Sequence, residues 1–374
     1  MNEIIALRHH LHSHPELSNQ ESATSATIEH FMAPLKPDRV IHVGSHGRLF
    51  LFEGTGSGKT TLFRAELDAL PIHENSGKMY ASQHPGISHA CGHDGHMSML
   101  AGLGVRIAAN RPLRGRVGLL FQPAEEVEQG ARDVVGDMQL NGIEPDAIFA
   151  LHNIPGIPMH HIVTRTGSFA SASKGMVIRL TGRSSHAGEP EKGINPAAAM
   201  ARIVLGIKQL NSEPGLFKET AFATVIHLKL GEVAHGTSPG EGEVRLTLRS
   251  FEGRDMETLT SRIEALVTEI SEDEQLKHGF MLTEVFPATV NDPACVSMIE
   301  RAARQQQIPL KRLEEPFRWS EDFGYYTEHF PGGFAGIGSG EQQPPLHHPG
   351  FDFPDEILDT GIRYYFELYS MNHL

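Results

Sequence analysis

The order of apolar segments along this chain constrains its fold more than any other feature. Up to about residue 151, helical stretches alternate with strand-like runs at Arg48–Phe52, Thr61–Leu67, Arg116–Phe121 and Asp146–Leu151. Such alternation predicts a largely parallel sheet. Between about residues 174 and 290 the order becomes β-α-β-β-α-β, a split-βαβ pattern. We therefore predict an α/β fold in which a mainly parallel-sheet domain, residues 1–172 and 290–374, is interrupted by a smaller α+β, ferredoxin-like domain, residues 173–289.

Length and composition support two folded domains. A chain of 374 residues, 39% of them apolar, exceeds a single compact core and is far from a disordered composition. With 32 Lys plus Arg against 46 Asp plus Glu, the net charge is −14, which argues against a nucleic-acid partner. No signal peptide and no apolar run of 18 residues is visible, so we expect a soluble, cytoplasmic protein that neither spans nor binds a membrane.

One glycine-rich segment imitates a phosphate-binding loop. Gly54-Thr-Gly-Ser-Gly-Lys-Thr60 contains Gly-Lys-Thr, but Glu53 stands where the first glycine of such a loop is required. The residues that follow predict a strand, not the helix that would meet the phosphates. We interpret the segment as a turn between two strands.

Three segments at or just after predicted strand ends carry metal-binding side chains. They are Cys91-Gly-His93-Asp94-Gly-His96, Phe121-Gln-Pro-Ala-Glu125-Glu126 and Leu151-His152-Asn153, and a fourth, Leu346-His347-His348-Pro349, lies near the C-terminus. Open α/β sheets place their sites at such strand ends. Cys91 is one of only two cysteines and sits among histidines, so a metal ligand is the better reading than a disulfide. Adjacent carboxylates point in different directions, so one of the two glutamates would bind metal and the other would move protons.

Each segment alone also has a structural reading. His152 could be a strand-end residue, His347 and His348 a solvated loop, and Glu125-Glu126 a helix-start charge. Their joint occurrence at successive strand ends favours a metal site. Thiolate, imidazole and carboxylate suit Zn and tolerate Mn, Co or Ni, but not Ca or Mg. A metal there lowers the pKa of water to about 7, and a carboxylate can take the proton, which implies attack by water on an amide or ester carbonyl.

Further motifs extend the pattern over residues 8 to 355. Besides the segments above they are His9-His-Leu-His-Ser-His-Pro-Glu-Leu-Ser-Asn-Gln-Glu21, Phe63-Arg-Ala-Glu-Leu-Asp68-Ala-Leu-Pro71, Ser185-His-Ala-Gly-Glu-Pro190 and Ser320-Glu-Asp-Phe323. Together they resemble the aminoacylase/carboxypeptidase superfamily of metallopeptidases, in its N-acyl-amino-acid amidohydrolase branch, which includes hippurate hydrolase and indole-acetyl-amino-acid hydrolase. The resemblance implies a metal-dependent hydrolase that cleaves N-acyl amino acids or similar small amide conjugates.

The resemblance also implies roles for individual residues. Two divalent metal ions (Zn, Mn, Co or Ni) would be held by Cys91, His93, Glu126, His152 and His347, with Cys91 bridging. Glu125 would be the general base and Asp68 would orient a ligating histidine, while His89 and His96 would support the site. From the inserted domain, His186 would stabilise the oxyanion, across the interface of a homodimer formed by this domain. Arg249 and Asn195 would bind the substrate.

Two departures from the family pattern affect substrate binding and local bonding. Glu66 stands where the family usually has Asp, and Gly236 stands where it has an Asn thirteen residues before Arg249. A dipeptidase or aminopeptidase of the same superfamily is the first alternative, although we find no carboxylate placed to recognise a free α-amine. A metal-binding protein that has lost catalysis is the second, and the retention of Glu125 speaks against it.

Overall fold

The computed structural model describes all 374 residues, which form two compact units. The larger unit comprises Met1–Phe169, Thr289–Glu315 and Asp322–Leu374, and the smaller comprises Ala170–Ala288 and Pro316–Glu321. The segment Pro316–Glu321 lies outside the range predicted for the inserted domain. It joins the smaller unit because the Ser171 amide donates to the carbonyls of Phe317 and Trp319, 3.1 Å each.

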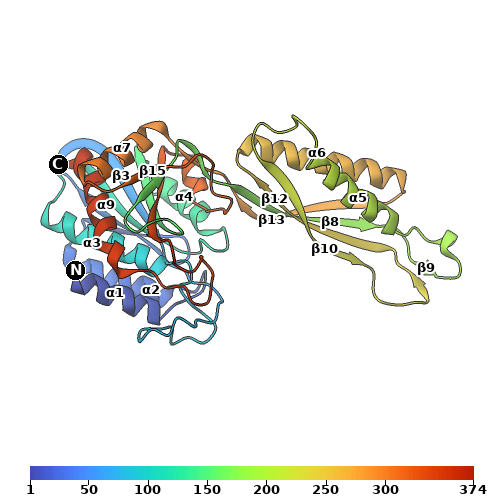
Figure 1. The fold of residues 1–374 in the computed structure, drawn as a ribbon, viewed down its shortest axis with the longest axis horizontal. Helices are drawn as coiled ribbons and strands as arrows, with labels where there is room; N and C mark the ends of the chain where they lie inside the picture. Colours follow the sequence, from blue (N-terminus) through green and yellow to red (C-terminus); the bar gives the residue numbers. More distant parts are fainter. The chain divides into compact units, whose positions relative to one another are not determined.

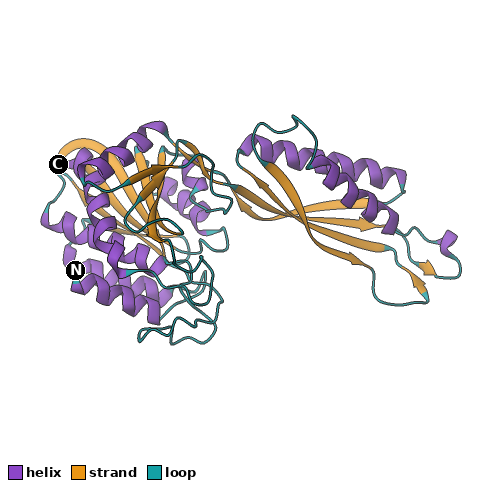
Figure 2. Ribbon diagram, in the orientation of Figure 1, coloured by secondary structure: helices purple, strands orange, loops and turns teal.

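The larger unit is an eight-stranded sheet with helices packed on it (Figures 1 and 2). Its helices are α1 (Asn2–Ser13), α2 (Ser22–Met32), α3 (His93–Ala109), α4 (Gly130–Leu140), α7 (Pro293–Gln305), α8 (Gly324–Thr327) and α9 (Leu358–His373), with short 3-10 turns η1 (Ala33–Leu35) and η3 (Asp355–Ile357). Its main strands are β1 (Arg39–Val43), β2 (Gly47–Glu53), β3 (Gly56–Glu66), β4 (Arg114–Gln122), β5 (Ala147–Pro155), β6 (Ile162–Thr164), β15 (Leu310–Arg312) and β16 (Gly332–Gly340). β7 (Gly167–Ala170) and β14 (Thr289–Asn291) form a separate two-stranded ribbon.

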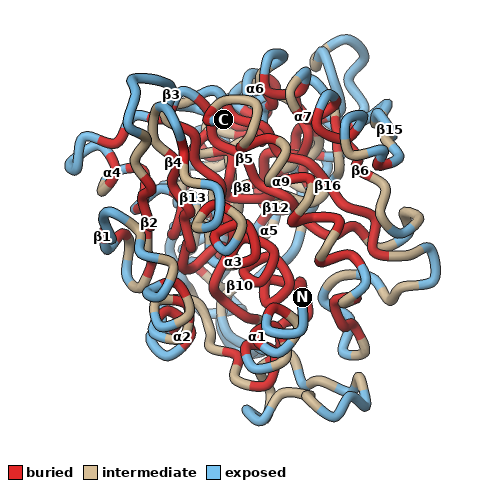
Figure 3. Tube along the Cα trace, turned by 90° about the vertical axis from the view of Figure 1, so that its left-hand side faces the viewer, coloured by how far each residue is buried: buried red, intermediate tan, exposed pale blue.

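The centre of the main sheet is parallel. The strand order is β1-β2-β4-β3-β5-β16-β6-β15. The four central strands, β4, β3, β5 and β16, are parallel to one another. The pairs β1–β2, β2–β4 and β16–β6 are antiparallel. Helices α1, α2, α3, α7 and α9 share one hydrophobic core with the sheet. Helix α3 is buried along most of its length (Figure 3). The carboxyl ends of the central strands therefore meet at one edge, beside the start of a buried helix.

The smaller unit is an antiparallel sheet with two helices on one face (Figure 2). The sheet order is β10 (Ala221–Leu230), β12 (Glu241–Ser250), β8 (Ala172–Thr181) and β13 (Lys277–Phe286). Helices α5 (Ala197–Leu210) and α6 (Gly253–Asp273) share a core with the sheet. Beyond one end of it lie a small ribbon of β9 (Ser185–His186) with β11 (Thr237–Ser238) and the turn η2 (Pro190–Lys192). The predicted fold class, a mainly parallel α/β domain with an inserted α+β domain, is confirmed.

Three local expectations can be compared with these elements. The glycine-rich segment joins two strands without a helix, as expected, but the turn is shorter than predicted: β2 ends at Glu53 and β3 already begins at Gly56, so only Gly54 and Thr55 lie between the strands. The sequence also predicts a helix from about Glu126, but this helix begins only at Gly130, since Ala124 and Glu128 adopt positive φ values of 54° and 62°. The sequence after about residue 307 predicts a Gly/Pro-rich tail, and this expectation is wrong, because the region contains β16 and α9. No helix has the length and apolarity needed to cross a membrane.

Candidate metal centre

The carboxyl ends of three parallel strands bring distant parts of the sequence together. Asp68 follows the end of β3, Glu125 and Glu126 follow the end of β4, and His152 lies in the second half of β5. Cys91 stands just before α3, which begins with His93, and His347 comes from the loop after β16. Of the predicted site residues, these seven belong to the larger unit.

Glycine is required between Cys91 and His93. Gly92 is the N-cap of α3 with φ of 93°, a left-handed conformation that side chains disfavour. A Cβ atom there would lie 2.2 Å from Asn153 Oδ1, which belongs to β5. The turn therefore sits tightly against β5, and this brings Cys91 next to His152.

The ligand atoms form two groups that share one residue. The potential donor atoms of Cys91, His93 and His152 lie within 4.8 Å of one another, and so do those of Cys91, Glu126 and His347. Cys91 Sγ lies 3.5 Å from His152 Nε2. Two ligands of one tetrahedral zinc, with bonds of about 2.3 and 2.05 Å, would be separated by about 3.5 Å. The donor set fits two neighbouring cations, and Cys91 is the residue that the two donor groups have in common.

Hydrogen bonds aim the imidazoles at this centre. His93 Nδ1 contacts the backbone oxygen of Asp68 at 2.8 Å, while its Nε2 is buried and makes no hydrogen bond. His152 Nδ1 bonds to the carbonyl oxygen of Asn153, also at 2.8 Å. In both rings the hydrogen bond of Nδ1 to a backbone oxygen leaves Nε2 directed toward the site, as is usual for metal-binding histidines. The Asp68 carboxylate itself is 3.6 Å from His93 Nδ1 and instead accepts bonds from Ser18 Oγ (2.7 Å) and from the Glu126 amide (2.9 Å).

The charges around the site favour a cation. Burial alone would lower the pKa of His93, but Asp68, Glu66 and Glu126 reverse this and raise it to about 10. Burial, reinforced by His96, holds the pKa of His152 well below its ordinary value, so this imidazole stays neutral and able to ligate. Buried carboxylates that stabilise a positive charge at His93, beside a neutral His152, form the electrostatic environment that a divalent metal satisfies when it takes the place of the proton.

A buried network behind the site includes residues to which the sequence analysis assigned no role. His96 Nδ1 bonds to Glu66 Oε2 at 2.8 Å, and Arg64 pairs with the other oxygen of Glu66. Arg64 also donates to Asp322 (2.6 Å) and Gln122 (2.8 Å). Glu66, which departs from the pattern of the resembled family, therefore bonds a histidine of the segment Cys91–His96. The sequence signal that could have revealed this network is Arg64, a charged residue inside the apolar run Thr61–Leu67.

A second buried network connects helix α1 with the two ends of the site. Arg8, fully buried, pairs with Asp94 at 3.1 Å and with Asp352 at 2.9 Å. Asp94 directly follows His93, and Asp352 lies five residues beyond His347. Arg8 thus joins the start of α3 to the loop that carries His347.

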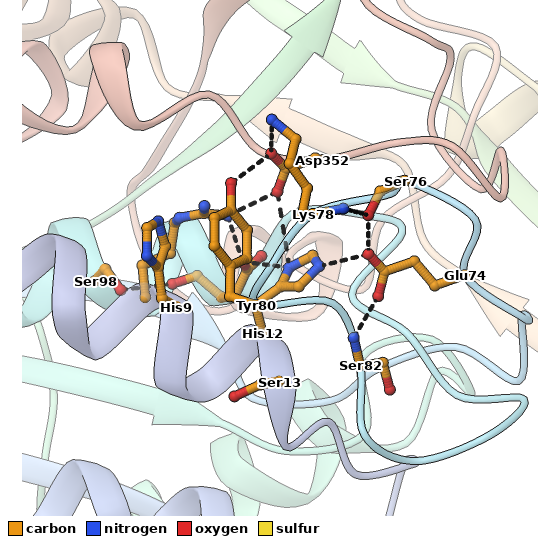
Figure 4. Close-up of polar contacts among 12 residues, drawn as sticks. His9, His12, Ser13, Glu74, Ser76, Lys78, Tyr80, Ser82, Ser98 and Asp352 are labelled. Atoms are coloured by element: carbon orange, nitrogen blue, oxygen red, sulfur yellow. Dashed lines mark hydrogen bonds and ion pairs between the residues drawn. The ribbon is translucent and has the colours of Figure 1, made fainter.

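His12 extends this network to the loop before α3. Its ring bonds to Asp94 (2.9 Å) and to Glu74 (3.1 Å). Figure 4 shows His12 with its contact to Glu74, and Tyr80 and Lys78 reaching Asp352. Burial alone would lower the pKa of His12, but Asp94 and Glu74 raise it to about 10, so His12 is a second buried cation here.

The remaining predicted residues belong to the smaller unit. His186 is exposed in β9, where it pairs with Thr237, and the Gly236 carbonyl beside it accepts the Ala187 amide at 3.0 Å. Asn195 uses its side chain locally, donating to Ser238 Oγ and accepting the Ala197 amide. Arg249 lies in β12 and donates to the Arg318 carbonyl at 2.7 Å.

Comparison with known proteins gives matches over almost the whole chain. The sequence pattern of peptidase family M20/M25/M40 matches residues 62–370. N-acetyl-L-cysteine deacetylase of Bacillus subtilis is 31% identical, over 98% of this chain and 87% of that protein. N-acetyldiaminopimelate deacetylase of Bacillus velezensis is 28% identical, over 98% of each. Among solved structures, the YXEP protein of Bacillus subtilis, described as a dinuclear metal-binding peptidase of the M20 family, aligns with a TM-score of 0.85 at 27% identity, over 99% of this chain and 97% of that one.

Proposed function

The chain belongs to peptidase family M20/M25/M40, and we propose that it hydrolyses the amide bond of N-acyl amino acids or similar small conjugates at a two-metal site. The observation that carries this proposal is the pair of ligand groups that share Cys91, with Glu125 beside them. The structural relative described as dinuclear and the two relatives named as N-acetyl deacetylases support it.

The predicted site residues of the larger unit divide the tasks of this reaction. Bound metals would polarise the amide carbonyl and lower the pKa of water. Cys91, His93, Glu126, His152 and His347 would hold them. Glu125 is 5% exposed, and its Oε2 lies 3.9 Å from His93 Nε2. We assign Glu125 as the general base that takes the proton from water and returns it to the departing amine.

The same donors support our proposals for the metal identity and the cellular compartment. Thiolate and imidazole with one carboxylate suit Zn, and Mn, Co or Ni can replace it. Neither Cys91 nor Cys295 is in a disulfide. Because Cys91 must stay reduced to act as a ligand, we propose the reducing cytoplasm as the compartment. The net charge of −14 supports a small-molecule substrate and no nucleic-acid partner.

The function is tested by metal analysis combined with a substrate panel. We expect about two divalent ions per chain and hydrolysis of N-acetyl or N-benzoyl amino acids in preference to dipeptides with a free α-amine. Removal of the ions with a chelator should abolish turnover, and addition of Zn or Mn should restore it. Faster cleavage of free dipeptides would support the peptidase alternative, and a metal-loaded protein that cleaves none of these amides would contradict the proposal.

The smaller unit supports a homodimer in which His186 acts on the partner's substrate. Arg249 lies eight residues along β12 from Glu241, about 25 Å at strand spacing, and His186 is beyond the Glu241 end. The two side chains of one unit therefore cannot both reach one small substrate. β10 is an edge strand of the sheet and exposes Ile226 and Leu228, which are 60% and 49% accessible. An apolar sheet edge of this kind favours pairing with a second copy.

Mixing two inactive variants tests this arrangement. Glu125→Gln and His186→Ala, each inactive alone, should recover about a quarter of wild-type activity when combined and allowed to exchange subunits, because half of the dimers then contain one intact site. Recovery would fail if His186 acted within its own chain. Light scattering of the Ile226→Glu, Leu228→Glu double variant should show a monomer, and a wild-type protein that is itself monomeric would contradict the dimer.

A further inference from the structure

A buried glutamate contacts the turn that presents the general base. Glu21, at the start of α2, is fully buried, and its Oε1 accepts the amide N–H of Ala124 at 2.8 Å. The Glu21 side chain makes no capping bond to its own helix. Burial of a carboxylate destabilises the folded protein unless a specific contact compensates for the loss of hydration. The contact observed here is with the residue directly before Glu125.

The backbone at this position is held in an unfavourable conformation. Ala124 has φ of 54°, in the left-handed region that residues with a Cβ rarely occupy. On the other side of Glu125, the amide of Glu126 is held by the buried Asp68 carboxylate at 2.9 Å. Two carboxylates from separate segments therefore fix the amides on both sides of Glu125, and strained backbone of this kind persists only where its surroundings enforce it.

We propose that Glu21 is a positioning residue for hydrolysis: its hydrogen bond to the Ala124 amide keeps the turn left-handed and thereby aims the Glu125 carboxylate at the water. This inference rests on the proposed function, in which Glu125 is the general base. Glu21 itself touches neither the ligand atoms nor the substrate. Without its bond the turn would relax to an ordinary conformation, and the Glu125 carboxylate would be displaced while the ligands of α3 and β5 remained in position.

Three variants test the hydrogen bond by kinetics. Glu21→Ala should lower kcat by about 5- to 30-fold with KM little changed. Without the hydrogen bond, only the fraction of molecules in which Ala124 keeps its left-handed conformation would be active. Glu21→Gln keeps an oxygen acceptor and should stay within about threefold of wild type. Glu16→Ala is the matched control, because the Glu16 carboxylate bonds the Thr24 amide at 2.7 Å in the same helix without touching the turn. It should lower the melting temperature and leave kcat unchanged.

A double-mutant cycle and a crystal structure separate positioning from stability. Glycine accepts positive φ, so Glu21→Ala should reduce kcat several-fold less in an Ala124→Gly background than in the wild type. In a crystal structure of Glu21→Ala, residue 124 should have left the left-handed region. An unchanged φ at Ala124, or equal losses of kcat in both backgrounds, would overturn the inference even if the wild type is an active amidohydrolase. A wild type that cleaves no amide would instead remove the proposed function, and the φ comparison would still test the role of the hydrogen bond.

Discussion

Replacement of Glu125 by Gln is expected to lower kcat by about 10²- to 10⁴-fold while both metal ions remain bound. The amide has the shape of the carboxylate but cannot accept a proton from water. Glu125 is almost fully buried beside His93, and no other carboxylate is assigned to this task. The measurement is kcat together with the metal content of the purified variant. Melting temperature should be close to that of the wild type, because the side-chain volume is unchanged.

Glu126→Gln is the matched control, because it makes the same change one residue away. Glu126 Oε1 lies 3.8 Å from His93 Nε2, and Glu126 Oε2 lies 3.7 Å from His347 Nε2. Loss of this proposed ligand should reduce the metal content or the metal affinity as well as kcat. If Glu125→Gln hydrolysed amides at an undiminished rate, or if it lost metal as Glu126→Gln should, the division of labour between these adjacent carboxylates would be wrong.

The fold was predictable where hydrophobic periodicity was strong. The alternation before residue 151 and the split-βαβ order after Lys174 predicted the two kinds of sheet. Strand β16 was missed because its sequence, Gly332-Gly-Phe-Ala-Gly-Ile-Gly-Ser-Gly340, has the composition of a loop. In the structure this strand lies in the interior of the sheet, and a Cβ at Gly336 would approach Val163 Cγ2 to 2.4 Å. Close packing between neighbours, which sequence composition does not reveal, explains these glycines.

For the site, the sequence indicated which residues carry donor atoms but not which ones hold them in place. Cys91, His93, Glu126, His152 and His347 follow strand ends or motifs, so their side chains could be grouped by chemistry. Arg8, Glu21 and Arg64 are buried charges, and most of their partners lie far away along the chain: 86 and 344 residues from Arg8, 103 from Glu21, and 58 and 258 from Arg64. No local pattern records such pairing, because it depends on tertiary contacts alone.

Replacement of Arg8 by Met is expected to destabilise the larger unit by about 3–5 kcal/mol, since it leaves buried carboxylates without their cation. Arg8 contacts Asp94, Asp352 and, at 2.5 Å, Asp355. For a unit of this size the loss corresponds to a fall in melting temperature of about 6–20 °C. Lys78→Met provides the control, because Lys78 pairs with the same Asp352 at 3.1 Å but is 47% exposed, and it should cost no more than about 1 kcal/mol.

The pH dependence of this loss distinguishes a charge effect from a packing effect. Burial alone would raise the pKa of Asp94, but His12 and Arg8 reverse this and hold it well below its ordinary value. A carboxyl group with a lowered folded-state pKa stabilises the fold above its unfolded pKa of about 3.9, and that contribution disappears as the pH falls through the folded value. The difference in unfolding free energy between wild type and Arg8→Met should therefore stay at its largest from pH 7 down to about pH 4 and shrink only as the pH falls below this value, whereas a lost packing contact would give a constant difference. Urea unfolding of both proteins from pH 7 to below about pH 4 measures this difference in free energy. Because Arg8 joins the start of α3 to the loop of His347, the affinity for metal at pH 7 should also fall in Arg8→Met. It should not fall in Lys78→Met.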